Sequence, residues 1–319
     1  MRGGIKLGLV TLALSLGFAA PVAAGQFEKA AAARSRFDYA TALRLCRPMA
    51  KQGHANAQYL LGEMYLDGLG VPQDYAEGAG WYRKAAAQGN ADAENGLGSV
   101  YQYGYGVPQD YAEAARWYRK AADHGLPDAQ NNLALLYNNG QGVPQDDAEA
   151  VRWLRKAADK NYELAQFNLG VSYHDGKGVP QDYIEAVRWY RKAAEHHNDW
   201  AEYNLGLLYE SGGPGVPQDY AKAVEWWRKA ADMYNAKAQY NLGRSYANGQ
   251  GVPQDFVLAH MWFNLAAMHY PASDSEGRAR AVNARDLVAE KMTPEQIAEA
   301  QKLAREWSSS YFGKLFGKK

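Results

Sequence analysis

Small and apolar residues recur along this chain with a helical spacing, and the whole pattern returns at a fixed interval. The motif Ala-x-x-x-Leu-Gly/Ala-x-x-Tyr, first seen from Ala57 to Tyr65, places residues four apart and so on one stripe of a helix. A second motif, typified by Trp-Tyr-Arg-Lys-Ala-Ala, follows after a loop. Both occur six times between residues 55 and 270, which predicts six pairs of helices, here named helix A and helix B of each repeat.

The pentapeptide Gly-Val-Pro-Gln-Asp separates the two helices of each pair. Its aspartates are 36, 36, 36, 37 and 36 residues apart: Asp74, Asp110, Asp146, Asp182, Asp219 and Asp255. Proline disfavours helix in the residue before it, and aspartate is a natural N-cap. A glutamate three residues after the first four aspartates completes a capping-box pattern: Glu77, Glu113, Glu149 and Glu185. We interpret the aspartates as helix caps rather than catalytic acids.

Two further columns predict how the helices pack. Glycine or alanine after the repeated leucine, as at Gly62, lowers helix propensity and indicates close approach of another helix. Helix B carries a tryptophan column: Trp81, Trp117, Trp153, Trp189, Trp226 and Trp262. Beside it run Tyr82, Tyr118, Leu154, Tyr190, Trp227 and Phe263. We expect these aromatic residues to form the core between repeats rather than a binding stack.

The two ends of the array depart from the period, as terminal repeats of a solenoid usually do. Residues 25–54 have the spacing of a helix B without its Pro-Gln-Asp start and are predicted to form an N-terminal helical cap. Residues 271–307 are predicted to form a C-terminal cap, with a last helix from Thr293 to about Trp307. Residues 308–319, which end on lysines, are predicted to be a flexible tail.

The first 24 residues have the composition of a secretory signal peptide. Arg2 and Lys6 precede an apolar run from Leu7 to Ala20, and small residues follow up to Ala24, after which we expect cleavage. The alternative is an uncleaved membrane-tethering helix, but the run is shorter than a bilayer-spanning helix requires. We therefore expect a periplasmic or secreted protein without stable membrane insertion. The chain has a single cysteine, Cys46, so it cannot form an internal disulfide, and we interpret Cys46 as a core residue.

Composition and motifs exclude several classes of function. Lysine plus arginine equals aspartate plus glutamate, 35 each, so the basic excess of a general nucleic-acid binder is absent. The sequence contains no Ser-x-x-Lys, Gly-x-Ser-x-Gly, His-Glu-x-x-His or P-loop motif. His196 and His197 are neighbours and would diverge on a helix, so they do not form a metal pair. We expect no catalytic residue, no metal and no cofactor.

The repeated motifs, together with the Gly-x-Gly-Val-Pro-Gln-Asp-Tyr loop, resemble the Sel1-like repeat, a variant of the tetratricopeptide fold. The resemblance covers residues 55–270 in six copies and implies an all-α fold, a right-handed α-solenoid of antiparallel helix pairs. For function it implies scaffold or adaptor work, including regulation and assembly in the cell envelope. Cysteine-rich relatives have been associated with β-lactam binding or hydrolysis. Their repeats each hold a cysteine pair, which this chain lacks.

Helix A has a variable side where we expect a partner to bind. If its first residue is position 1, then positions 5, 6 and 9 lie opposite the repeated residues. Aromatic and amide side chains in this set suit recognition of an extended peptide. The predicted partner-binding residues are Tyr59, Asn131, Asn132, Phe167, Asn168, Tyr203, Asn204, Tyr240, Asn241 and Arg244. The resemblance to tetratricopeptide proteins implies that Asn132, Asn168, Asn204 and Asn241 contact peptide backbone; the alternative is that they bond only to neighbouring repeats or to the loop.

We therefore predict a non-enzymatic, monomeric periplasmic scaffold or regulator that binds a protein or peptide partner on the concave helix-A face. The alternative function is a β-lactam or cell-wall hydrolase of the cysteine-rich Sel1-like type. The absence of a nucleophile–base pair in the motifs favours the first.

Overall fold

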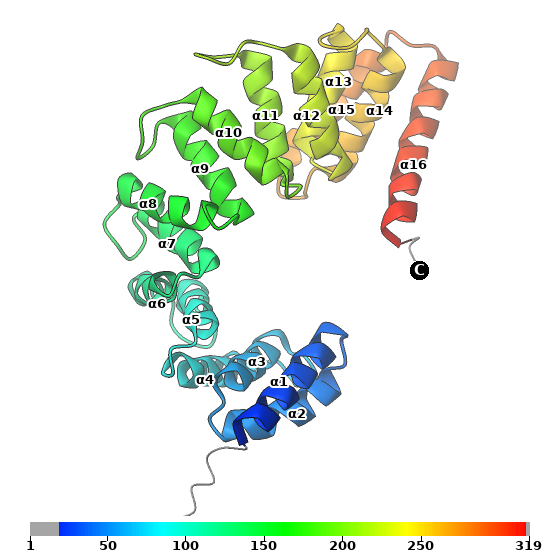
Figure 1. Ribbon diagram of the computed structural model, residues 1–319. Helices are drawn as coiled ribbons and strands as arrows, with labels where there is room; N and C mark the ends of the chain where they lie inside the picture. Colours follow the sequence, from blue (N-terminus) through cyan, green and yellow to red (C-terminus); the bar gives the residue numbers. More distant parts are fainter. Residues whose placement is uncertain (1–18, 317–319) are drawn as a thin grey trace, which may run out of the picture. The chain divides into compact units, whose positions relative to one another are not determined.

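The computed structural model describes residues 19–316, and all named elements in this range are helices. The prediction of an all-α solenoid of helix pairs is confirmed. The helices A are α3 (Ala55–Asp67), α5 (Ala91–Tyr103), α7 (Pro127–Asn139), α9 (Glu163–Asp175), α11 (Asp199–Ser211) and α13 (Ala236–Asn248). The helices B are α4 (Tyr75–Ala86), α6 (Tyr111–Asp123), α8 (Asp147–Ala158), α10 (Tyr183–Ala194), α12 (Tyr220–Asp232) and α14 (Phe256–His269) (Figure 1).

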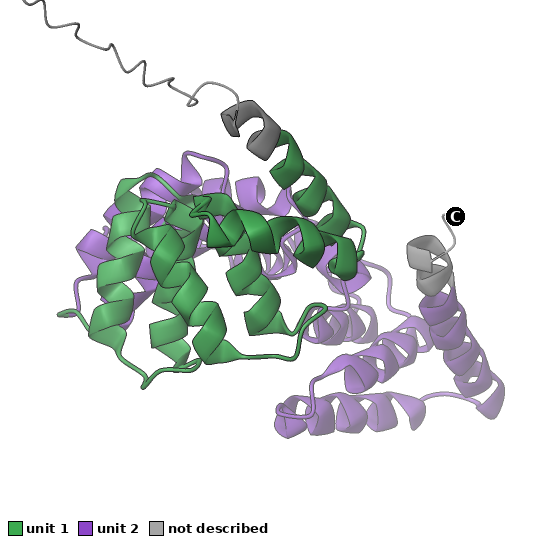
Figure 2. Cartoon of the chain, turned by 90° about the horizontal axis from the view of Figure 1, so that it is seen from below, with its two compact units in different colours: residues 1–129, 141–144 green, residues 130–140, 145–319 purple. Residues whose placement is uncertain are grey.

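The chain divides into two compact units (Figure 2). Unit 1 comprises residues 1–129 and 141–144, and unit 2 comprises residues 130–140 and 145–319. At the ends of the array lie α1 (Ala19–Ser35), α2 (Tyr39–Lys51), α15 (Ser275–Ala289) and α16 (Pro294–Phe316). Most of the predicted signal peptide, residues 1–18, lies outside the described residues. None of the helices within the described range is long and apolar enough to cross a membrane.

The Gly-Val-Pro-Gln-Asp loop is closed by hydrogen bonds to both helices. Asp74 Oδ1 accepts a hydrogen bond from the Glu77 amide, which confirms the aspartate as the N-cap of α4. The Asp74 amide donates to the carbonyl of Tyr65 in α3 at 2.9 Å. Gln73 Nε2 donates to the carbonyl of Leu66 at 2.6 Å. The loop therefore satisfies carbonyls that the end of helix A would leave unpaired.

The reciprocal half of the predicted capping box is wrong. In a capping box the glutamate side chain would accept from the Asp74 amide, but that amide is already bonded to Tyr65. The Glu77 carboxylate instead accepts from Trp81 Nε1 at 2.9 Å. In the second repeat the equivalent Glu113 pairs with Arg116 at 2.6 Å.

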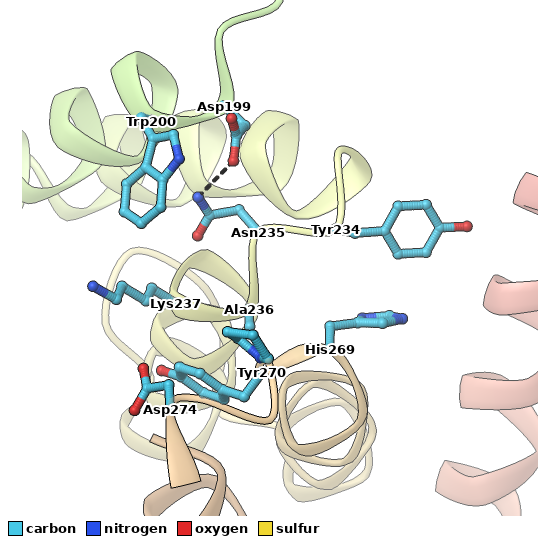
Figure 3. Close-up of a pocket in the computed structure, with 10 residues that line it drawn as sticks. Asp199, Trp200, Tyr234, Asn235, Ala236, Lys237, His269, Tyr270 and Asp274 are labelled. Carbon is cyan, nitrogen blue, oxygen red and sulfur yellow. Dashed lines mark hydrogen bonds between the residues drawn. The ribbon is translucent and has the colours of Figure 1, made fainter. Parts of the chain in front are cut away.

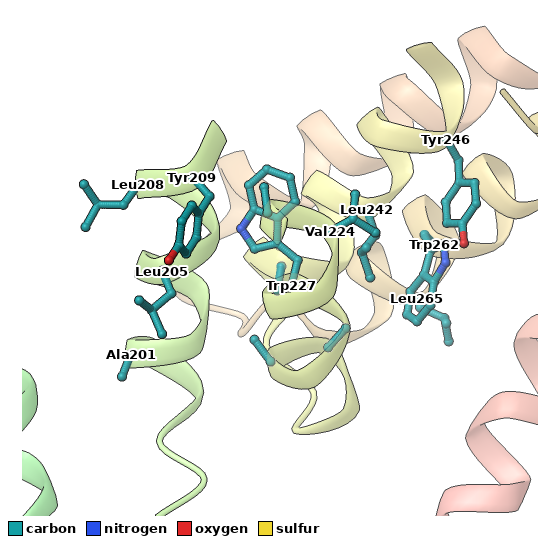
Figure 4. Close-up of a cluster of buried hydrophobic side chains, with 14 of the residues drawn as sticks. Ala201, Leu205, Leu208, Tyr209, Val224, Trp227, Leu242, Tyr246, Trp262 and Leu265 are labelled. Carbon is teal, nitrogen blue, oxygen red and sulfur yellow. The ribbon is translucent and has the colours of Figure 1, made fainter. Parts of the chain in front are cut away.

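In five of the six repeats, the column glycine allows an aromatic ring of helix B to lie against the backbone of helix A. A Cβ built on Gly206 of α11 would come within 2.2 Å of Trp227 Nε1 in α12. Figure 4 shows Trp227 in the buried cluster of unit 2, between α11 and α13. The third repeat has Ala134 and Leu154 at the equivalent positions, both fully buried. A larger residue on helix A is thus matched by a smaller one on helix B.

The tryptophan column is less buried than the column beside it. Trp117 and Trp226 are only half-buried, whereas their neighbours Tyr118 and Trp227 are each 1% exposed. A lysine three residues later covers each of five tryptophan rings, with the ammonium nitrogen 3.7–4.1 Å from the ring centroid. The deepest part of the core is therefore the neighbouring column. The tryptophans mark its edge and carry cation–π contacts.

The two ends of the chain are packed by apolar residues. Ala30 and Ala33 of α1 are buried in the cluster that includes Cys46 and Met49 of α2. At the other end, the Trp307 ring of α16 meets the Trp262 ring with centroids 5.7 Å apart. The helix predicted to end near Trp307 continues to Phe316, so the predicted tail starts too early. The hydroxyls of Ser308 and Ser309 donate to carbonyls four residues earlier, which lets serines remain within a helix.

Candidate partner-binding surface

The candidate surface consists of positions 5, 6 and 9 of the helices A, called the helix-A face below. The repeated positions of these helices point into the core: Ala201 and Leu205 of α11 are fully buried. The helix-A face is more exposed. Its position-9 residues in unit 2 include Leu135, which is 37% exposed, and the half-buried Val171 and Leu207. The surface of unit 2 thus keeps apolar side chains at the boundary between core and solvent.

The aromatic residues at position 5 are half-buried because they pack on helix B of their own repeat. The ring of Tyr59 stacks on that of Tyr82, with centroids 5.5 Å apart and planes inclined by 15°. Phe167 packs on Tyr190 at 5.9 Å and Tyr240 on Phe263 at 5.4 Å. Each ring therefore presents one part to the core and another part to the helix-A face.

The asparagines predicted to bind a partner make hydrogen bonds within the array. Asn168 Nδ2 donates to Asn131 Oδ1 of the preceding repeat at 2.8 Å. Burial raises the pKa of Tyr190, and the Asn204 side chain beside its hydroxyl opposes that rise. Asn241 acts in the same way on the pKa of Tyr203, and both tyrosines are in preceding repeats. These contacts match the alternative in which the asparagines link neighbouring repeats.

The burial of these asparagines differs. Asn131 and Asn241 are buried, whereas Asn132, Asn168 and Asn204 are half-buried. Arg244, the last predicted binding residue, donates to Asn241 Oδ1 and forms an ion pair with Glu210 at 3.2 Å. A partner that contacted the two buried asparagines would have to displace such contacts. The half-buried members of the predicted set are the ones accessible to a partner.

A cavity of about 270 Å³ lies at another edge of unit 2, beside the starts of α11 and α13 (Figure 3). Trp200 and Lys237 are among its lining residues, and the Lys237 ammonium lies 5.1 Å from the centroid of the Trp200 ring. Asn235 Nδ2 donates to Asp199 Oδ2 at 2.9 Å. The Trp200 ring and the Asp199 carboxylate of this cavity therefore already have partners within the chain, Lys237 and Asn235.

Two smaller features bear on chemistry. Burial raises the pKa of Cys46 to about 11, so its thiol stays protonated near neutral pH, as expected of the core residue that was predicted. His196 and His197 are exposed, and His197 adopts a left-handed backbone with φ of 61°. Among the described residues, no group of three His, Cys, Asp or Glu is arranged to hold a metal ion.

Helix pairs of this geometry, joined by capped loops and closed by terminal helices, define an α-solenoid of the tetratricopeptide type. The Sel1 repeat family model matches residues 55–90, 91–126, 127–162, 164–198, 201–235 and 236–270. These segments make up well over half of the 319 residues. The chain belongs to the Sel1 repeat family. Proteins of this family are generally non-enzymatic scaffolds for protein–protein interaction.

Several solved structures resemble this chain. A Sel1 repeat protein from Oxalobacter formigenes is 31% identical with a TM-score of 0.64, and the match covers 80% of this chain and 96% of that protein. A protective antigen with the SLR fold from uropathogenic Escherichia coli is 26% identical with a TM-score of 0.33, covering 93% and 95%. An immunity protein from Pseudomonas aeruginosa is 20% identical with a TM-score of 0.42, covering 73% and 81%. No curated protein matches the sequence.

Proposed function

We propose that the protein is a non-enzymatic, exported interaction module whose helix-A face binds a protein or peptide partner. The observation that carries the proposal is the position-9 column of unit 2, in which Leu135, Val171 and Leu207 remain unburied in successive helices A. Half-buried amides at position 6 stand beside them. Apolar area flanked by groups that both donate and accept hydrogen bonds suits an extended peptide.

Photo-crosslinking in intact cells tests this surface. A photoreactive residue replaces Leu135 or Leu207 on the helix-A face. The matched controls replace Arg152 of α8 or Arg188 of α10, which are exposed on helices B with side chains 69% and 60% accessible. We expect a partner band from the first pair and none from the second. Equal crosslinking from both pairs, or none from the helix-A face, contradicts the proposal.

A charged substitution gives an independent measurement. Leu135→Glu combined with Leu207→Glu places two carboxylates in the apolar column without removing a fully buried side chain. We expect capture of the crosslinked partner to fall at least tenfold while the helical circular dichroism signal stays unchanged. Asparagine substitutions are less suitable, because Asn168 also bonds to Asn131 of the preceding repeat and Asn204 lies beside Tyr190.

Export to the periplasm is part of the same proposal and rests on the N-terminal sequence. Three side chains of α1 beyond Ala24 are packed: Phe27 stacks on His54 with ring centroids 5.4 Å apart, and Ala30 and Ala33 are buried. Cleavage after Ala24 would therefore leave this packing in place. Fractionation and N-terminal sequencing should find a mature protein that begins at Gly25 outside the cytoplasm. A protein that keeps Met1 and stays with the membrane would contradict this part.

A further inference from the structure

The helix-A face of unit 1 contains an open cavity of about 400 Å³. It lies between α3 and α5, above the ring of Tyr82 from α4. Its walls combine tyrosine rings with the carboxylates of Glu63, Asp67 and Asp92. All of these groups belong to unit 1.

Gly96 stands at the wall of the cavity, at position 6 of α5, and lets the Tyr82 ring lie against the backbone of this helix. A Cβ on Gly96 would come within 2.4 Å of that ring. Position 6 is occupied by Asn132, Asn168, Asn204 and Asn241 in the third to sixth repeats. At the equivalent place in unit 2, Asn204 lines a cavity beside Tyr190 that measures about 230 Å³.

The hydroxyl of Tyr82 is a polar group at the wall of this cavity. The Tyr82 side chain is only 6% exposed and lines the cavity. No hydrogen-bond partner for its hydroxyl occurs among the residues that the structure describes, and the hydroxyl oxygen is not among the fully buried polar atoms. Burial raises the pKa of its equivalent in unit 2, Tyr190, and the Asn204 side chain beside that hydroxyl opposes the rise. An accessible hydroxyl without a protein partner, which can both donate and accept, is available to a ligand.

The charge of the cavity is negative. Arg34 of α1 forms an ion pair with Glu63 at 3.0 Å, but Asp67 and Asp92 have no ion-pair partner within the described part of the chain. Burial raises the pKa of Tyr59, and the negative charges of Glu63 and Asp92 raise it further. At the equivalent place in unit 2, Val171 replaces Glu63 and Trp200 replaces Asp92. Two of the three carboxylates are therefore peculiar to the first cavity.

The mouth of the cavity is aromatic. The rings of Tyr75 and Tyr105 are stacked with centroids 5.1 Å apart, and Tyr103 stacks on Tyr105 at 5.5 Å. All three are exposed, so their ring faces and edges are open to a ligand. Aromatic faces beside carboxylates attract an organic cation through both the ring quadrupole and the full charges.

We propose that this cavity binds a cationic side chain of the protein partner, the ammonium of a lysine or the guanidinium of an arginine. The inference rests on the proposed function, because it supplies the chemistry of one residue in the bound segment. The cation lies between the tyrosine rings and the carboxylates of Asp67 and Asp92, and its N–H groups donate to the Tyr82 hydroxyl. The positively charged residue thereby sets the register of the segment on the repeats that follow within unit 1.

A positional-scanning peptide library tests the inference. Acetylated, amidated nonapeptides with one position fixed as lysine, arginine, norleucine or glutamate are captured on the immobilised full-length mature protein and quantified by mass spectrometry. We expect lysine or arginine at one position to be enriched at least fivefold over norleucine, and the enrichment to fall as NaCl is raised. Norleucine has a lysine-like chain without the charge, so the ratio isolates the cation.

Three variants locate the site. Asp67→Asn combined with Asp92→Asn removes two exposed carboxylates and should abolish the preference. Gly96→Asn forces a side chain against the Tyr82 ring at the cavity wall and should weaken capture of the cationic peptides. Because a Cβ at position 96 would come within 2.4 Å of Tyr82, this variant also strains the fold, and the amide pair is the decisive variant. Asp175→Asn at the equivalent place in α9 is the matched control and should change nothing.

The outcomes separate this inference from the proposed function. Captured peptides without a cation preference, or a preference that survives Asp67→Asn/Asp92→Asn, overturn the inference and leave the interaction module standing. Absence of both peptide capture and crosslinking from Leu135 and Leu207 removes the proposed function as well. If free tetramethylammonium binds as tightly as the peptides, the ligand is a small organic cation, and the assignment to a partner side chain is overturned.

Discussion

Two kinds of interface hold unit 2 together, and they differ in chemistry. Inside a repeat, helix A and helix B meet through a glycine against an aromatic ring, as at Gly206 and Trp227. Between repeats, polar side chains add hydrogen bonds: Arg191 donates to the hydroxyl of Tyr209 at 2.7 Å, and Gln239 to the carbonyl of Ala231 at 3.2 Å. The first interface depends on shape, and the second depends in addition on donors and acceptors. Substitutions at the two interfaces should therefore destabilise the protein for different reasons.

The largest effect should come from removing the aromatic ring inside a repeat. Trp227→Ala leaves a cavity beside Gly206 and should lower the free energy of unfolding by about 3–5 kcal/mol. Trp226→Ala is the matched control, since the adjacent tryptophan is half-buried and should cost clearly less. Urea denaturation followed by circular dichroism measures both. Equal losses would remove the distinction between the two columns.

Crowding the same interface should have the next largest effect. A Cβ on Gly170 would meet the Tyr190 ring at 2.6 Å, so Gly170→Ala should destabilise by about 1–3 kcal/mol. The third repeat combines Ala134 with Leu154 at these positions. Adding Tyr190→Leu should therefore cost less in the Gly170→Ala background than alone. Strict additivity in this double-mutant cycle would show that the two residues are not coupled.

The polar interface has a weak point at Glu202, which replaces the glutamine of other repeats. Gln58, Gln166 and Gln239 each donate to a carbonyl eight residues earlier, which a carboxylate cannot do. Glu202 is buried and its Oε2 has no hydrogen-bond partner. Burial raises its pKa to about 7, with Lys229 opposing the shift and Asp199 and Asp232 adding to it.

Glu202→Gln should therefore stabilise the protein in a pH-dependent manner. Because the pKa in the folded state lies above the ordinary glutamate value of 4.5, the contribution of Glu202 to stability is complete below pH 4.5 and is lost as pH rises through 7. We expect a gain of about 1–2 kcal/mol at pH 8 and little gain at pH 4, measured by urea unfolding. Glu94→Gln is the comparison, because burial raises the pKa of Glu94 but the His124 ring nitrogen, 3.1 Å from its carboxylate, opposes that rise, so that this variant should gain less. A gain independent of pH would contradict the assignment.

The smallest effect concerns the turns between repeats. His197 and Asn161 hold left-handed backbone conformations where earlier repeats have Gly89 and Gly125. His197→Gly should raise the free energy of unfolding by about 0.5–1 kcal/mol, because glycine adopts positive φ without steric cost. The His197 side chain is exposed, so little packing is lost. Differential scanning calorimetry would detect the change, and an unchanged or lower Tm would contradict it.

The sequence predicted the parts of the fold that every repeat shares. The period, the aspartate caps and the close approach at the column glycines all follow from residues that recur in register. A residue that returns at the same place in successive repeats indicates a structural requirement at that place. Contacts between residues 30 or more positions apart in the sequence were harder to predict. The bond from Asn168 to Asn131 requires knowledge of how one helix A meets the next, which a single helical wheel does not contain.

The departures from the columns carried information that the pattern alone concealed. Gly96, where later repeats have asparagine, marks the place where the Tyr82 ring lies against α5, and Glu94 and Glu202 place buried acids in a column that is otherwise glutamine. The paired change to Ala134 and Leu154 signals a contact between helices A and B. In each case the signal is a departure from the recurring residue, and its meaning depends on the depth and direction of the side chain.

The second glycine of each loop has a consequence for how the array is built. A Cβ on Gly178 would lie 2.1 Å from the carbonyl oxygen of Asp147, and one on Gly251 would lie 2.2 Å from that of Tyr220. Each loop is thus seated on backbone at the start of the preceding helix B, which has already been synthesised. A chain synthesised from its N-terminus therefore completes each docking platform before it makes the loop that rests on it. If synthesis ran from the C-terminus, each loop would be made before its platform.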